Sequence, residues 1–137
     1  MNAFVRIFLR TCGLLLTLMI VIANASAALW ETSVTPGDND KFKSADYRIW
    51  LPDGVQQIRA VIVRQHGCGR NGITHANDLQ WQALAAKWDA ALLGTHYQVH
   101  EKCDEWSNPD NGSEQAFLSA LATFAAQTKH PELTTAP

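Results

Sequence analysis

Basic residues are few and scattered in this chain of 137 residues. The 11 Lys and Arg residues are outnumbered by 13 acidic residues and form no patch or stripe. Two of the bases and none of the acids lie in residues 1–27, so the rest of the chain carries nine bases against 13 acids, a net charge of −4. Proteins that bind nucleic acid neutralise phosphates with clustered Lys and Arg. The composition therefore argues against nucleic acid as a partner.

The chain also lacks an apolar run long enough to span a bilayer. Its longest, 13–22, falls short of the roughly 18–20 residues that a span needs. Arg6 and Arg10 precede this run, and Ala25-Ser26-Ala27 follows it as a small-x-small cleavage site. This layout is typical of a secretory signal peptide, and a single membrane anchor is the alternative. We expect residues 1–27 to be removed, leaving a secreted or periplasmic domain with no stable membrane span.

Cysteine is rare as well. Cys12 lies in the expected signal peptide, which leaves Cys68 and Cys103. An even pair in an oxidising compartment favours a disulfide, and two free thiols are the alternative. In the chain-entropy picture, closing this loop would stabilise the fold by about 3 to 4.7 kcal/mol.

The hydrophobic pattern beyond residue 27 predicts strands alternating with helices. Residues 28–45 are polar and rich in turn residues, with the clearest loop at 36–40, and 96–112 reads as a long polar loop. The predicted elements, in the order β-β-α-β-α, are strands at 47–51, 58–63 and 90–95 and helices from 77 or 78 to 88 and at 113–128. This order predicts an α/β fold with a mostly parallel sheet.

Two apolar patterns predict where these elements are buried. The centre of the 58–63 strand is β-branched and continuous rather than alternating, which predicts a strand buried on both faces. Trp81, Leu84, Ala85 and Trp88 recur at helical spacing, so we expect both tryptophans in the core. In the last helix the predicted buried stripe consists of Phe117, Ala120, Leu121, Phe124 and Ala125.

The segment His66-Gly67-Cys68-Gly69 directly follows the second predicted strand. Gly67 and Gly69 allow backbone angles that a β-carbon would forbid. Free N–H groups of such a loop can converge on the oxygen that becomes negative during acyl transfer. The Cys68 N–H is the first candidate donor and the Gly69 N–H the second, with His66 bracing the loop through its ring. An ordinary glycine turn is the alternative.

A nucleophile motif is missing. No Gly-x-Ser-x-Gly segment occurs in the sequence. Ser107, Ser113 and Ser119 lack the sharp strand-to-helix turn that activates a catalytic serine, and Ser113 reads as a helix cap. No catalytic nucleophile, acid or base is therefore identifiable.

The chain resembles the N-terminal half of secreted α/β-hydrolase-fold esterases, the group with polyhydroxyalkanoate-depolymerase-like and feruloyl-esterase-like enzymes. The resemblance covers nearly all of 28–137 and rests on Tyr47–Pro52, Val61–Gly69, Trp81–Ala85 with Ala91–Thr95, and Asn111–Glu114 with the helix up to His130–Leu133. The resemblance implies a serine-type carboxylic ester hydrolase without a cofactor, acting on a small-molecule or polymer ester when complete. It implies that 28–137 is a partial domain ending before the nucleophile elbow, truncated and inactive alone, with 133–137 leading into a further strand. Of the family's site, only the oxyanion loop carries over.

Two other interpretations remain open: a non-catalytic remnant that binds a ligand or partner, and a small metal-binding domain. The metal-capable residues are His66, Cys68, His75, His96, His100 and Cys103. No Cys-x-x-Cys pair or helical His pair occurs among them, so we expect no metal.

Two further expectations concern the loops at the strand ends. Cys68 and Cys103 each follow a strand, and parallel strands would place their loops at the same edge of the sheet. Trp106 could line a substrate cleft there or simply cover the edge of the core.

Overall fold

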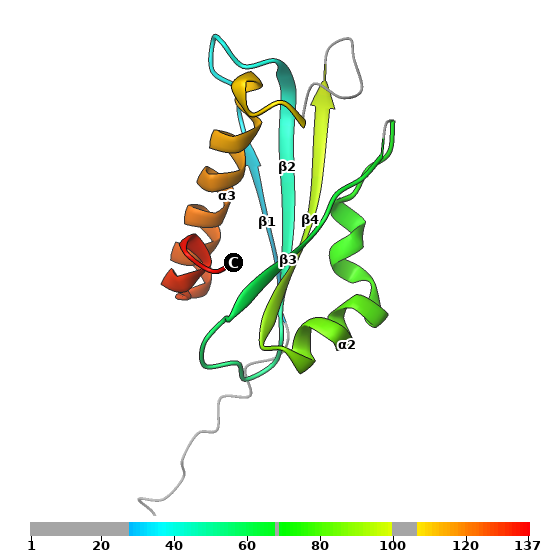
Figure 1. Ribbon diagram of the computed structural model, residues 1–137, viewed down its shortest axis with the longest axis vertical. Helices are drawn as coiled ribbons and strands as arrows, with labels where there is room; N and C mark the ends of the chain where they lie inside the picture. Colours follow the sequence, from blue (N-terminus) through cyan, green and yellow to red (C-terminus); the bar gives the residue numbers. More distant parts are fainter. Residues whose placement is uncertain (1–27, 68, 100–106) are drawn as a thin grey trace, which may run out of the picture.

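The computed structural model describes residues 28–67, 69–99 and 107–137. Four strands form one sheet in the order β1-β2-β4-β3 (Figure 1). They are β1 (Ala28–Val34), β2 (Phe42–Leu51), β3 (Ala60–Arg64) and β4 (Ala90–Val99). The central strands β2 and β4 are long, and the edge strand β3 is the shortest of the four.

The sheet is mixed, so the prediction of a mostly parallel α/β-hydrolase-type sheet is wrong. β1 pairs with β2, and β2 with β4, in antiparallel fashion; only β3 and β4 are parallel. The physical reason lies in the connections, because a parallel pair needs a crossover, usually a helix. Among the described residues, the only α-helix between successive strands is α2, between β3 and β4.

Strand β1 was not expected, because 28–45 reads as a polar loop. Its residues alternate between exposed and half-buried, and Trp30 and Val34 pack against the buried core. That period of two is the mark of a half-buried strand, and the polar residues between hid it. The 36–40 segment is indeed part of a turn, with the Asp40 N–H donating to the Gly37 carbonyl at 3.2 Å.

Two α-helices cover opposite faces of the sheet, α2 (Leu79–Lys87) and α3 (Ser113–Thr128) (Figure 1). The predicted cap of α2 is confirmed, because Asp78 Oδ1 accepts from the N–H groups of Gln80 and Trp81 at 3.0 and 3.3 Å. A cap by Ser113 is wrong: α3 follows Gly112 at φ 86°, and no side chain caps it. None of the helices in the described ranges combines the length and apolar character needed to cross a bilayer.

The described residues also form short 3-10 helices at η1 (Ile73–Asn77), η3 (Pro109–Asn111) and η4 (Pro131–Thr134). The last of these includes Leu133 and Thr134, the first residues of the segment that we expect to lead into a further strand. Beyond η4, the Val61 N–H of β3 donates to the Pro137 carbonyl at 2.9 Å. This bond lies on the side of β3 that faces away from β4, so it ties the end of the sequence to the sheet edge.

The larger core lies between the sheet and α3. Tyr47, Ile49, Leu93 and Phe124 are among its fully buried members. Of the stripe predicted for α3, Ala120, Leu121, Phe124 and Ala125 are buried, and Phe117 is partly buried. The last helix therefore packs on the sheet as its periodicity predicts.

The core under α2 is small, and two burial predictions fail beside it. Trp88 is 60% exposed and Leu84 is 42% exposed, so only part of the apolar stripe of α2 meets the sheet. Val63 is 43% exposed because β3 is an edge strand rather than a central one. A continuous apolar run cannot tell an edge position from a central one, since both give the same letters.

Candidate functional site

The predicted oxyanion loop leaves the sheet at the end of β3, while the parallel strand β4 continues beside it to Val99. Their register places Arg64 beside Gly94, so the chain after β3 emerges alongside Thr95, His96 and Tyr97. This arrangement brings the loop next to β4. We expected loops that follow parallel strands to lie at the same edge of the sheet, and β3 and β4 are the parallel pair to which that expectation applies. The bracing contacts of the loop come from β4.

His66 is buried and uses both ring nitrogens to fix the loop. Its Nε2 accepts from the backbone N–H of Tyr97 at 3.1 Å. Its Nδ1 lies 2.7 Å from the carbonyl oxygen of Gly67. Since Tyr97 can only donate and the carbonyl can only accept, the ring is neutral with its proton on Nδ1. His66 therefore holds the loop in place, and it has no nitrogen left to act as a general base.

A tight turn follows His66. The Arg70 N–H donates to the Gly67 carbonyl at 3.1 Å, and Gly69 has φ 66°. Glycine adopts a positive φ of this kind without the steric cost that a β-carbon would bring. Neither Gly67 nor Gly69 would bring an added β-carbon within 4 Å of another group. The positive φ therefore explains why residue 69 is glycine. Neither backbone angle nor close packing explains the glycine at position 67.

The segment after the turn lies directly on the backbone of β4. A β-carbon at Gly72 would come within 2.4 Å of the Thr95 carbonyl oxygen, and one at Gly94 within 2.5 Å of the Gly72 carbonyl oxygen. Both distances are shorter than real β-carbon contacts, so the two chains approach this closely only because both positions are glycine. No sequence motif marks Gly72 and Gly94 as a pair, because the two residues lie on different segments.

Tyr97 connects the loop to the core. Its N–H binds His66, and its hydroxyl donates to the Ser113 carbonyl at 3.2 Å. The Tyr47 hydroxyl lies 2.5 Å from the Tyr97 hydroxyl, inside the core. Burial raises the pKa of both phenols; the neighbouring Tyr97 raises that of Tyr47 further, whereas the hydrogen bond from Tyr47 lowers that of Tyr97. The phenols therefore stay neutral and fix β2, β4 and α3 to one another beside the loop.

A groove of about 270 Å³ opens beside the start of the loop, between β3 and α3. Val63 and Gln65 line it from the β3 side, and Phe117 lines it from α3. Thr95 and Tyr97 form its floor from β4. The Thr95 hydroxyl donates to the Gln65 side-chain oxygen, which fixes that amide against the sheet. This groove is the concave site closest to the predicted loop.

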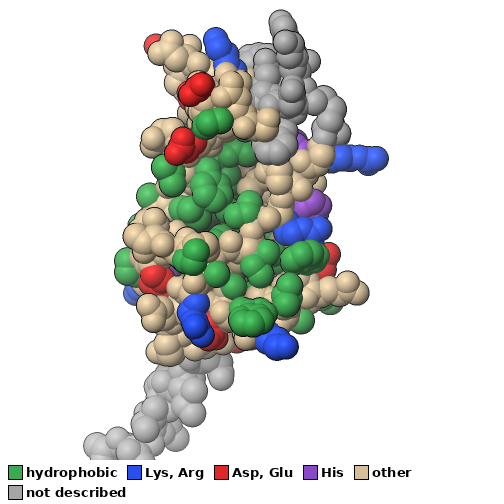
Figure 2. Space-filling view, in the orientation of Figure 1, with side chains coloured by type: hydrophobic (Ala, Val, Ile, Leu, Met, Phe, Trp, Pro, Cys, Tyr) green, Lys and Arg blue, Asp and Glu red, His purple; other side chains and the backbone are tan. Residues whose placement is uncertain are grey.

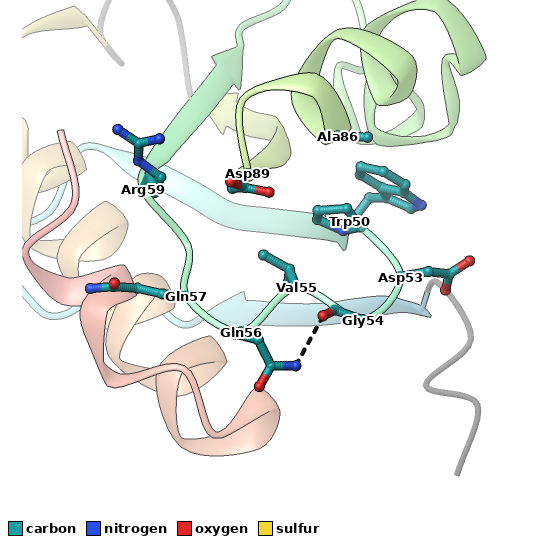
Figure 3. A pocket seen from close by; sticks show the side chains of 10 residues that line it. Trp50, Asp53, Gly54, Val55, Gln56, Gln57, Arg59, Ala86 and Asp89 are labelled. Carbon is teal, nitrogen blue, oxygen red and sulfur yellow. Dashed lines mark hydrogen bonds between the residues drawn. The ribbon is translucent and has the colours of Figure 1, made fainter. Parts of the chain in front are cut away.

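A larger cavity, of about 610 Å³, lies at the opposite end of the sheet, where β2 ends and β3 and β4 begin (Figure 3). Trp50, Val55 and Asp89 lie around its hollow, whereas the side chains of Gln56 and Gln57 point away from it (Figure 3). Gln56 bonds the carbonyl of Gly54 at 3.1 Å instead. The side-chain amides that line this cavity do not converge on one point, so we do not assign the cavity as the functional site.

Several predicted site residues lie outside the described residues: Cys68, His100, Cys103 and Trp106. The disulfide between Cys68 and Cys103 and the cleft position of Trp106 therefore stay predictions. The Cys68 N–H, first choice as oxyanion donor, stays one as well. No described residue accepts a hydrogen bond from the Gly69 N–H, so this group is the candidate donor of the turn.

The described residues do not bring together a set of side chains that could bind a metal ion. His66 and His96 have ring centroids 5.2 Å apart, but both nitrogens of His66 are already engaged. The part of the chain that the structure describes contains no group of three or more His, Cys, Asp or Glu able to hold a metal. Three of the six predicted donors lie outside that part.

The serines of α3 are engaged by groups other than histidine. The Ser113 hydroxyl is buried and donates to the Asn108 carbonyl at 3.2 Å, and the Ser119 hydroxyl accepts from the Gln115 amide at 3.4 Å. A serine becomes a nucleophile when a base accepts its proton. Both contacts join these hydroxyls to neighbouring residues of the chain, and neither contact is with a base.

Comparison with known proteins does not identify the chain: a scan of protein-family models and a search of curated proteins give no match. The esterase resemblance therefore rests on the segments quoted from the sequence.

Proposed function

We propose that this chain carries the oxyanion-binding part of a carboxylic ester hydrolase of the exported serine type. The observation that supports it most is the fixed loop after β3. His66 holds the Gly67 carbonyl and the Tyr97 N–H at once, and Gly69 closes the turn with φ 66°. A preorganised backbone donor needs this kind of bracing, because its orientation must be set before charge develops.

In the proposed chemistry, backbone N–H groups of the loop bind an oxygen that becomes negatively charged during the reaction. In ester hydrolysis a nucleophile adds to the carbonyl carbon, and the carbonyl oxygen becomes negative in the tetrahedral intermediate. The N–H groups of Gly69 and Cys68 are proposed to donate to that oxygen. Because His66 is neutral and fully engaged, it positions these donors and transfers no proton.

The proposal for the chain as it stands is binding without turnover. Among the described residues, no histidine bonds the hydroxyl of Ser113 or Ser119, and the sequence offers no nucleophile motif. We therefore expect no hydrolysis of p-nitrophenyl acetate beyond that of a denatured sample. Turnover that a serine-directed phosphonate abolishes would show that a nucleophile is present.

The loop can be tested with an anion that mimics the tetrahedral intermediate. The probe is methyl methylphosphonate, a tetrahedral phosphorus monoester that carries one negative charge. We expect it to shift the backbone amide signals of Gly67 and Gly69 in a ¹⁵N-correlated NMR spectrum of the full chain. Methyl acetate, which is planar and neutral, should shift them less because the donors are set for a developed charge.

Two glycine variants provide matched controls. Gly69→Ala places a β-carbon at φ 66° and should abolish the phosphonate-induced shifts. Gly67→Ala meets no other group and needs no positive φ, so it should retain them. Circular dichroism would confirm that both variants keep the fold. Equal responses from the two variants, or no response from the native chain, would contradict the oxyanion function.

A further inference from the structure

The groove beside the loop is large enough to hold a small ligand group, although many of the residues that line it are polar. Its volume of about 270 Å³ exceeds the roughly 150 Å³ of an apolar cavity that admits benzene. Val63 and Phe117 form apolar walls on its two sides. Hydrophobic side chains also gather over the face that β3 crosses, between α3 and α2 (Figure 2). Space is therefore available for a small apolar group.

The hydroxyl groups in this lining have no proton left to give. Thr95 donates to the Gln65 side chain, Tyr97 to the Ser113 carbonyl, and Ser113 to the Asn108 carbonyl. A hydroxyl has one proton, so none of the three can donate to a ligand without losing a protein hydrogen bond. Ser107 is partnered too. The Gln65 amide nitrogen has no hydrogen-bond partner among the described residues, but it is buried from solvent and so does not face the open groove. A ligand with hydrogen-bond acceptors would find them unmatched here.

The charge at the groove is negative. Glu114, at the start of α3, lines it and is exposed. No Lys or Arg is among the described residues that line it. A carboxylate entering the groove would therefore meet a like charge without a counter-ion, which disfavours free acids relative to neutral groups.

We infer that this groove binds a neutral hydrocarbon group, a short alkyl chain or a single ring, and excludes acids. The groove opens beside the loop that would hold the ester oxygen, so in an ester substrate it would hold the acyl group. This role rests on the proposed function. Val63 and Phe117 set its width, and Glu114 sets its charge preference. The substrate class is thus an ester whose group at this position is uncharged and lacks hydrogen-bonding substituents.

The test compares two probes with the same chain length, 1-hexanol and hexanoate, on the full chain. We expect hexanol to shift the amide signals of Val63, Thr95 and Phe117 in a saturable way. Hexanoate should bind at least about fivefold more weakly, because its carboxylate meets Glu114 and loses water. Neither measurement involves turnover or the phosphonate probe, so failure of the groove is distinguishable from failure of the oxyanion loop.

Three variants separate the causes. Glu114→Gln should raise hexanoate affinity about threefold and leave hexanol affinity unchanged. Asp53→Asn, which removes a carboxylate at the opposite end of the sheet, should change neither. Val63→Asp, at an exposed position, should abolish hexanol binding without unfolding the chain. Hexanol shifts that map elsewhere, or equal hexanoate affinity in the Glu114 and Asp53 variants, would overturn the inference.

Discussion

The two faces of the sheet are covered by helices in different ways. On one face, α3 buries Ala116, Ala120, Leu121 and Phe124 against the strands. On the other, α2 buries Ala85 and leaves Leu84 and Trp88 partly in solvent. The difference shows that the α3 face supplies most of the buried apolar volume. The loop and η1, whose backbone contacts β4, depend instead on hydrogen bonds and on backbone contacts made possible by glycine.

The largest effect should come from the same substitution placed on each helix. Leu121→Ala in the buried stripe of α3 should lower the free energy of unfolding by about 2–5 kcal/mol, through lost burial and the cavity left behind. Leu84→Ala, at a position 42% exposed, should cost less than about 1 kcal/mol. Urea denaturation of both variants measures the contrast. Equal losses would remove the distinction between the two faces.

A smaller effect should follow from disturbing the backbone contact over β4. Gly94→Ala would force a β-carbon to within 2.5 Å of the Gly72 carbonyl oxygen, so the η1 segment must move. We expect a loss of about 1–3 kcal/mol, the range for overpacked sites, together with shifted amide signals for His66. Gly37→Ala, whose β-carbon would meet only ordinary contact at 3.6 Å, is the control. If both variants behaved alike, close packing would not hold the loop.

The phenol pair tests the polar part of the α3 face. Tyr47→Phe removes the donor to the Tyr97 hydroxyl and should cost about 1 kcal/mol at neutral pH. Because burial raises the pKa of both phenols, native stability is fully present below the ordinary value of 10.0 and falls as the pH rises above it. The variant has one such phenol fewer and should show a weaker fall. Urea midpoints measured at neutral and alkaline pH would contradict this if the two proteins fell equally.

The smallest effect should appear in acid, at Glu132. Burial alone would raise the pKa of this carboxylate, but the Ile58 N–H at 2.7 Å and His130 at 2.8 Å outweigh it and lower the pKa below 4.5. The stability it contributes is therefore present above that value and is lost as the pH falls through the lowered pKa. We expect less than about 1 kcal/mol, absent from Glu132→Gln. A variant with the same acid dependence as the native chain would exclude this contact as its source.

Local signals in the sequence located most elements correctly. Asp78 before an apolar stripe marked the start of α2, and the periodicity of α3 identified its buried residues. The pairing of the strands could not be found this way, because β2 bonds to β4 across a long separation in sequence. β1 was hidden because Glu31 and Ser33 alternate with half-buried residues, a weaker signal than a continuous run.

The site divides in the same manner. That His66 braces the loop could be predicted from its position before two glycines, and the structure confirms it. Its partner Tyr97 lies in another strand, where no sequence motif marks it. The tautomer of His66 depends on that partner, so only the three-dimensional arrangement shows that the ring is neutral and engaged on both sides.

The close approach of Gly72 and Gly94 has a consequence for inheritance. A side chain at either position would push η1 away from β4, and the opposite glycine would then lose its reason to be kept. Descendants of this sequence should therefore retain or lose the two glycines together, although the residues lie on different elements. Such a coupled pair would mark the family in an alignment more reliably than the short His-Gly-x-Gly motif, because many unrelated turns share that motif.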